Sequence, residues 1–109
     1  MWHTILITID YPVKFLRIMK KISVIGAGQM GSGIAQVAAQ FAKIPQVILF
    51  DKSQAQLDAQ KYKLAEYFEK AKQKGSIKQD EINRTLSSIK TTTKLNDLEG
   101  SDFIIEVSF

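Results

Sequence analysis

The chain has 109 residues, of which 45% are hydrophobic, and this is enough for one small globular domain with a single core. It contains no cysteine, so disulfide bonds and thiolate metal sites are excluded. The formal net charge is +4, but no run of apolar residues approaches the roughly 20 that span a bilayer, and no basic and aromatic pattern indicates a nucleic-acid module.

Residues 1–18 do not share the pattern of the rest of the chain. An apolar stretch at Ile5–Ile9 favours a short strand, and the residues after it are typical of a break. The acidic Asp10, a single arginine and the absence of serine argue against a mitochondrial transit peptide. We interpret residues 1–18 as an N-terminal extension, either disordered or the product of an upstream start, and place the domain at residues 19–109.

A short apolar run, Ile22–Ile25, is typical of a strand buried on both faces of a parallel sheet. Three glycines follow it directly with the spacing G-x-G-x-x-G, at Gly26, Gly28 and Gly31, and apolar residues then recur at helical intervals. This order predicts a strand, a tight turn and a helix over about residues 30–43. Gly26 would permit the turn, Gly28 the close approach of a pyrophosphate, and Gly31 the packing of the helix on the strand.

Phosphates would bind to the unpaired N–H groups at the start of this helix, where the helix dipole favours negative charge. A glycine-rich turn without a ligand is the alternative that the spacing alone leaves open. A second apolar run, Val47–Phe50, ends at Asp51, about 20 residues beyond the last glycine, where dinucleotide-binding folds place the carboxylate that binds the adenosine ribose. The two signals together predict a dinucleotide site. The negative charge of Asp51 favours NAD over NADP, and only the neighbouring Lys52 argues against this.

Two helices are predicted between the second strand and the third. Serine and glutamine have the S-x-x-Q spacing of a capping box at residues 53–56 and 76–79, and each pair marks a helix start. The first helix has an apolar stripe that we assign to the core: Leu57, Leu64, Phe68 and Ala71. It ends at Gly75 as its C-cap, and the second helix ends at about Ser88.

The remaining residues predict two further strands, Lys90–Thr93 and Phe103–Val107, with a single helical turn over residues 95–98 between them. Right-handed crossovers between parallel strands give the spatial order 3-2-1-4. We therefore predict an α/β fold, an incomplete Rossmann-type parallel sheet of about four strands with flanking helices, in which the fourth strand is buried.

Four segments of the sequence carry a resemblance to a known family: VIGAGQMGSGIAQVAAQ at 24–40, LFD at 49–51, KGSI at 74–77 and DFIIE at 102–106. They are similar to the NAD-binding domain of 3-hydroxyacyl-CoA dehydrogenases, including the 3-hydroxybutyryl-CoA dehydrogenases. The related 3-hydroxyisobutyrate and 6-phosphogluconate dehydrogenases share the methionine before the last glycine, but not the S-G-I-A-Q that follows it. The resemblance implies that NAD binds through its pyrophosphate to Gly26, Ala27, Gly28, Gln29, Met30 and Gly31, and through its ribose to Asp51.

The resemblance also implies a substrate contact on the helix after the second strand. There a lysine of the family contacts the nucleotide end of acyl-CoA, and Lys74 matches it, while Tyr67 stands where some members have a serine. Lys74 is one of six lysines in this region that we otherwise expect on a solvated helix face: Lys61, Lys63, Lys70, Lys72, Lys74 and Lys78. The complete enzymes are expected to be homodimers that oxidise 3-hydroxyacyl-CoA to 3-oxoacyl-CoA in the β-oxidation of fatty acids.

The sequence departs from the family pattern at its end. Members continue as E-A-V-x-E after the fourth strand, whereas Glu106 is followed here by Val107, Ser108 and Phe109. The family's catalytic histidine, its partner glutamate and the helical second half have no counterpart, and the one histidine, His3, lies outside the nucleotide fold. We expect a truncated domain without catalytic or metal-binding residues, which binds NAD weakly and does not turn over substrate. The alternative is a non-catalytic or structural relative, as lambda-crystallin is; the expected location is the cytoplasm or, alternatively, the mitochondrial matrix, with no nucleic-acid or membrane partner.

Overall fold

The computed structural model describes residues 19–107, so the strand expected at Ile5–Ile9, the extension to which it belongs and His3 lie outside the described residues. The elements follow in the order β1 (Lys21–Ile25), α2 (Gln29–Gln40), β2 (Gln46–Phe50), α3 (Gln54–Gln73), α4 (Gln79–Ser88), β3 (Ile89–Thr92), the 3₁₀ turn η1 (Leu95–Leu98) and β4 (Phe103–Glu106). Between residues 19 and 107, no helix has the length and apolar character needed to cross a bilayer.

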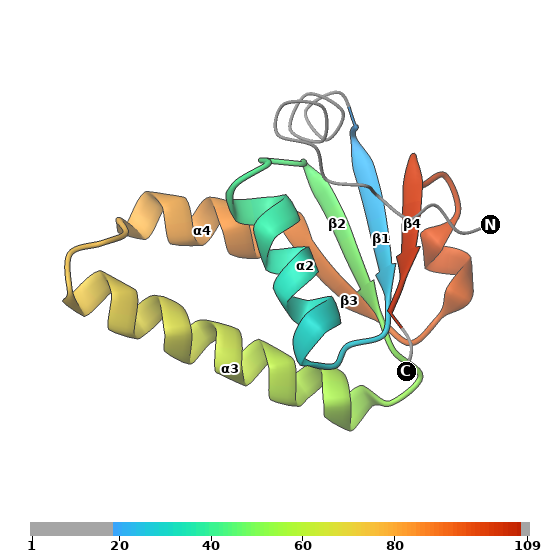
Figure 1. The fold of residues 1–109 in the computed structure, drawn as a ribbon, viewed down its shortest axis with the longest axis horizontal. Coiled ribbons are helices and arrows are strands. Elements are labelled where there is room, and N and C mark those ends of the chain that lie inside the picture. The colour runs from blue at the N-terminus through green and yellow to red at the C-terminus, as the bar shows by residue number, and fades with distance from the viewer. Residues whose placement is uncertain (1–18, 108–109) are drawn as a thin grey trace.

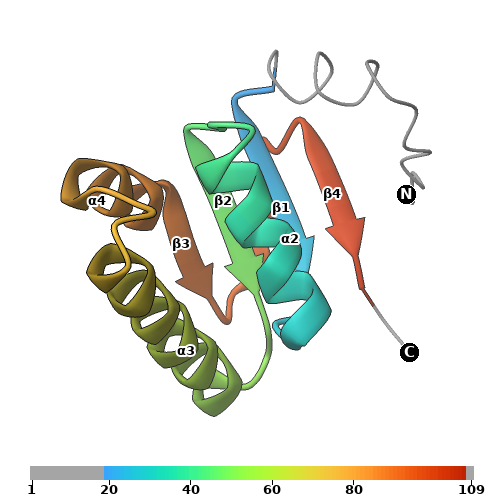
Figure 2. The ribbon, with the colours of Figure 1, turned by 60° about the vertical axis from the view of Figure 1, so that its left-hand side comes forward.

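The four strands form one parallel sheet with the order β3-β2-β1-β4, which confirms the predicted order 3-2-1-4. Ile25 is paired with Phe50 on one side and with Glu106 on the other, so β1, β2 and β4 end at the same level. In Figures 1 and 2, α2 covers one face of the sheet over β1 and β2, while α3 and α4 lie at the side of the sheet where β3 is. The glycine turn between β1 and α2 is therefore at the carboxyl edge of the sheet, next to the end of β2.

The main core lies between the central strands and α2. Small residues on the buried side of α2 let its backbone approach the sheet closely: Ala35, Ala38 and Ala39. They pack against fully buried residues on the facing side of the sheet: Ile22, Val24 and Val47. Leu57, from the first turn of α3, completes this core.

A second, smaller cluster holds the far ends of α3 and α4 together. It is built from Phe68, Ile77 and Ile82, with Leu64 and Ala71 packed against it. In the apolar stripe predicted for α3, Leu57 and Phe68 are buried, whereas Leu64 and Ala71 are partly buried. The stripe is also divided, because Leu57 joins the main core and the others join the second cluster.

The carboxyl end of α2 differs from the prediction. The helix ends at Gln40, three residues before the predicted Lys43, whose φ of 58° is in the left-handed region. The guanidinium of Arg84, on α4, donates to the carbonyl oxygens of Ala39 and Gln40 at 3.0 Å each. Because α2 has no basic residue in its own last turn, Arg84 supplies the positive charge that the carboxyl end of a helix dipole favours.

One of the two predicted helix caps is present. Ser53 caps α3, since its Oγ accepts the N–H of Gln56 at 3.2 Å. The cap predicted at Ser76 is wrong, because its Oγ donates to the carbonyl of Ala71 at 3.0 Å, and α4 has no side-chain cap. The cause is Gly75, whose φ of 77° turns the chain so that Ser76 lies back over the last turn of α3.

The strand β4 is less buried than predicted. Phe103, Ile104 and Ile105 are half-buried, because in the described chain β4 is at the edge of the sheet and pairs with β1 alone. The pairing continues past the strand end, where the N–H of Val107 donates to the carbonyl of Ile25 at 2.9 Å. This brings Val107 next to the glycine turn.

Candidate nucleotide-binding site

The turn after β1 depends on Gly26. Its φ is 109°, a backbone conformation that residues with a side chain rarely adopt. Its N–H donates to the carbonyl of Phe50 at 2.8 Å, and this hydrogen bond connects the turn to the end of β2. A Cβ here would lie 2.6 Å from the carbonyl oxygen of Val107. Both backbone conformation and space therefore require glycine.

The other two glycines of the motif are needed for different reasons. A Cβ on Gly31 would lie 1.8 Å from the carbonyl oxygen of Gly26, so α2 rests directly on the turn and only glycine fits. Gly28 has an ordinary φ of −75°, and a Cβ there would meet nothing within 4 Å. The turn is therefore open at Gly28, and the backbone there is accessible from outside the turn.

The first turn of α2 offers N–H groups to an anion. The N-cap Gly28 has no side chain to accept them, and the first turn contains no acidic residue. Ser32 is the first residue of the helix whose N–H has a helical acceptor, the carbonyl of Gly28 at 3.0 Å. The N–H groups of Gln29, Met30 and Gly31, at the positive end of the helix dipole, have no acceptor among residues 19–107. This is the arrangement that binds phosphate in nucleotide folds.

Asp51 lies directly against the glycine turn. One carboxylate oxygen accepts the N–H of Ala27 at 2.9 Å, and the other accepts the N–H of Ser53 at 2.9 Å. A carboxylate has about four acceptor positions, so two remain for hydroxyl groups of a ligand. The structure thus brings together the predicted glycine segment and the predicted acidic residue.

Gln56 is the residue of this site that the sequence interpretation missed. Its side-chain amide donates to the carbonyl of Ala27 at 2.9 Å, across 29 positions of sequence. A capping-box glutamine would instead pair with the N–H of Ser53, but Asp51 already accepts that group. The S-x-x-Q spacing therefore indicated that Gln56 forms a hydrogen bond but predicted the wrong partner for it.

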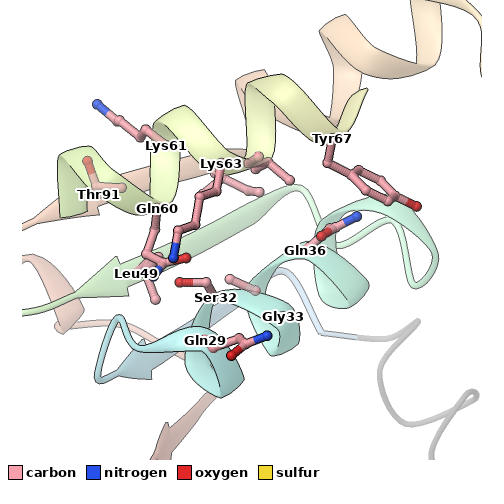
Figure 3. Close-up of a pocket in the computed structure, with 13 residues that line it drawn as sticks. Gln29, Ser32, Gly33, Gln36, Leu49, Gln60, Lys61, Lys63, Tyr67 and Thr91 are labelled. Atoms are coloured by element: carbon pink, nitrogen blue, oxygen red, sulfur yellow. The ribbon is translucent and has the colours of Figure 1, made fainter. Parts of the chain in front are cut away.

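A pocket of about 390 Å³ opens between α2 and α3. Its lining comes from α2 (Gln29, Ser32, Gly33, Ala35 and Gln36), from α3 (Gln60, Lys61, Lys63, Leu64 and Tyr67) and from the strands (Leu49, Ile89 and Thr91). Figure 3 shows the polar ends of Gln60, Lys63 and Ser32 directed toward one another, with Tyr67 at the other end of the pocket. The Oγ of Ser32 is buried and has no hydrogen-bond partner among the described residues.

The structure does not bring Lys74 to the glycine turn. Lys74 is the C-cap of α3, one residue before the predicted cap Gly75, at the far end of a helix whose 20 residues span about 30 Å. Tyr67, which lines the pocket, lies between Lys74 and the start of the helix. All six lysines of this region are exposed, as predicted for a solvated face. Among residues 19–107, no group of three His, Cys, Asp or Glu side chains is arranged to hold a metal ion.

Comparison with known proteins identifies the family. A family model described as 3-hydroxyacyl-CoA dehydrogenase, NAD binding domain, matches residues 21–109. This chain belongs to that family. A 3-hydroxybutyryl-CoA dehydrogenase of Mycobacterium tuberculosis is 35% identical over 88 residues, and a probable one of Deinococcus radiodurans is 41% identical over 86 residues. These matches cover 81% and 79% of this chain but 30% of each relative, so the chain spans about a third of their length.

Solved structures agree with this assignment. The crystal structure of M. tuberculosis FadB2 matches with a TM-score of 0.76 and 35% identity over 84% of this chain and 31% of that protein. The (S)-3-hydroxybutyryl-CoA dehydrogenase PaaH1 of Ralstonia eutropha matches with a TM-score of 0.77 and 27% identity over the same shares. The chain thus has the Rossmann-type fold of the family described as the NAD binding domain of 3-hydroxyacyl-CoA dehydrogenases.

Proposed function

We propose that the chain binds NAD, with the pyrophosphate on the N–H groups of the first turn of α2 and the adenosine ribose on Asp51. The observation that carries this proposal is the position of the Asp51 carboxylate, which contacts the turn at Ala27 and keeps two acceptor positions. Membership of an NAD-binding family supports the choice of cofactor. When bound, NAD supplies a hydride acceptor at its nicotinamide ring, while the residues named here hold its adenosine and pyrophosphate.

Calorimetric titration of the chain with NAD and NADP tests this proposal. We expect NAD to bind more tightly, because the Asp51 carboxylate would repel a 2′-phosphate, and the exposed Lys52 is too solvated to reverse the preference. The variant Asp51→Ala should weaken NAD binding at least about tenfold, since hydrogen bonds to a charged group contribute about 1.5–3 kcal/mol. Asp58→Ala removes an exposed carboxylate of α3 whose hydrogen bond goes to Gln54, and it serves as the control. Equal NAD affinity in the wild type and Asp51→Ala would contradict the assignment.

Within a complete enzyme, we propose that this domain serves the oxidation of 3-hydroxyacyl-CoA to 3-oxoacyl-CoA in fatty acid β-oxidation. The names of the relatives support this reaction, and one of them is a peroxisomal fatty acid beta-oxidation multifunctional protein of Oryza sativa, 31% identical over 90 residues. The complete enzyme is proposed to be a homodimer located in the cytoplasm, with the mitochondrial matrix as the alternative.

We further propose that Lys74 binds the nucleotide end of the acyl-CoA substrate. Its exposed ammonium group at the end of α3 is free to approach a phosphate, and the pocket that Tyr67 lines lies along the same helix. Titration with coenzyme A tests this, with Lys72→Ala as a matched control, because both lysines are exposed and both changes remove one positive charge near the end of α3. We expect Lys74→Ala to weaken binding more than Lys72→Ala. Equal weakening would mean that only the general charge of α3 attracts the ligand.

A further inference from the structure

The peptide between Ala27 and Gly28 is held from the neighbouring helix. Ala27 is fully buried, and its carbonyl oxygen accepts the side-chain amide of Gln56 at 2.9 Å. The N–H of Ala27 is held in turn by Asp51 at 2.9 Å. Two successive peptide groups of the glycine turn are therefore fixed by residues from the end of β2 and the first turn of α3.

Holding this carbonyl also sets the direction of the next N–H group. The carbonyl of Ala27 and the N–H of Gly28 belong to one planar trans peptide, so they point in opposite directions. With the carbonyl directed at Gln56, the N–H of Gly28 points away from α3. Gly28 is also where the turn is open, since a Cβ there would meet nothing within 4 Å.

We propose that Gln56 is a positioning residue for the cofactor, which acts by orienting the Ala27–Gly28 peptide so that its N–H faces the pyrophosphate. This inference rests on the proposed binding of NAD at the glycine turn. Gln56 does not touch the cofactor in this proposal, and its effect passes through the backbone of Ala27.

The expected effect follows from the population of turn conformations. Without an amide donor, the buried carbonyl of Ala27 has no partner in its present orientation, and a rotated peptide that reaches water becomes competitive. The apparent dissociation constant equals the intrinsic one divided by the fraction of molecules with the binding-competent turn. A lower fraction weakens the binding of every ligand that needs the N–H of Gly28.

The test compares Gln56→Met with Gln54→Met. Methionine keeps the approximate length of glutamine but has no donor. Gln54 is an exposed glutamine in the same helical turn, and its amide donates to Asp58 at 2.9 Å, away from the glycine turn. We expect Gln56→Met to raise the calorimetric dissociation constant for NAD about tenfold, which corresponds to about 1.4 kcal/mol. We also expect faster deuterium exchange at the amides of Gly26 and Ala27, whose N–H groups are bonded to Phe50 and Asp51 in the ligand-free chain, and no change of either quantity in Gln54→Met.

A purely structural role for Gln56 predicts a different result. The melting temperature of Gln56→Met would fall, while NAD affinity and amide exchange in the turn, measured well below that temperature, would equal those of the wild type; this outcome overturns the inference. Should Gln56→Met not fold, Gln56→Asn retains an amide that is one methylene too short to reach Ala27, and the same losses are expected of it. If the wild type itself does not bind NAD, the proposed function fails, whereas the exchange comparison still decides whether Gln56 orients the turn.

Discussion

Replacing Arg84 with methionine should destabilise the carboxyl end of α2. The change removes both hydrogen bonds from the guanidinium to the carbonyls of Ala39 and Gln40 but keeps most of the apolar stem. These two residues are 0% and 7% exposed, so their carbonyl groups are left without a partner in a site that water barely reaches. Hydrogen bonds to a charged group contribute about 1.5–3 kcal/mol, and since Arg84 is partly exposed we expect a loss of about 2–3 kcal/mol for the pair.

The loss is measured by urea unfolding followed by circular dichroism. For a domain of this size, it corresponds to a melting temperature lower by roughly 10–20 °C. Arg84→Lys separates charge from geometry, because an ammonium group keeps the favourable interaction with the helix dipole but cannot bond both carbonyls as a planar fork does. It should fall between the wild type and Arg84→Met. A free energy of unfolding for Arg84→Met within about 0.5 kcal/mol of the wild type, the range of ordinary surface changes, would refute the reasoning.

Two further predictions use the same measurement. Gly31→Ala and Gly33→Ala make the same chemical change in α2, but a Cβ at Gly31 would lie 1.8 Å from a backbone oxygen, whereas one at Gly33 meets nothing within 4 Å. We expect the first to cost more than about 3 kcal/mol and the second to stabilise by about 0.5–1 kcal/mol; two changes of the same sign would contradict this. The N–H groups of Lys20 and Lys21 hold the pKa of Asp102 below its ordinary value of 3.8. Its bonds therefore contribute stability above that pH, which is lost as the pH falls through the lower pKa of the folded chain, and Asp102→Asn should show a shallower loss between pH 5 and 2.

The strand order was predictable because parallel strands joined by right-handed crossovers leave few arrangements. The meeting of Asp51 with the glycine turn follows from the same geometry, since both lie at the carboxyl ends of neighbouring strands. The sequence therefore predicts the frame of the site from local patterns that extend over a strand or a helix.

Contacts that depend on a particular side-chain direction were not predictable. Arg84 reaches the end of α2 across 44 and 45 positions of sequence, and no local pattern indicates such a partner. For Gln56 the local pattern offered the N–H of Ser53, but Asp51 accepts that group and the buried carbonyl of Ala27 needs a donor. In both cases an unsatisfied backbone group elsewhere in the fold decides the outcome, and it becomes visible only when the elements are packed.

The separate apolar cluster of Phe68, Ile77 and Ile82 holds the end of α3 against the start of α4, apart from the main core. This cluster shares no residue with the main core. We therefore expect the end of α3 and the start of α4 to unfold and refold locally while the sheet stays intact. Native-state exchange should accordingly show the amides around the α3–α4 turn opening at a lower free energy than those of β1 and β2. The segment around Lys74 would then change its conformation when it binds a ligand, whereas the glycine turn would keep its conformation.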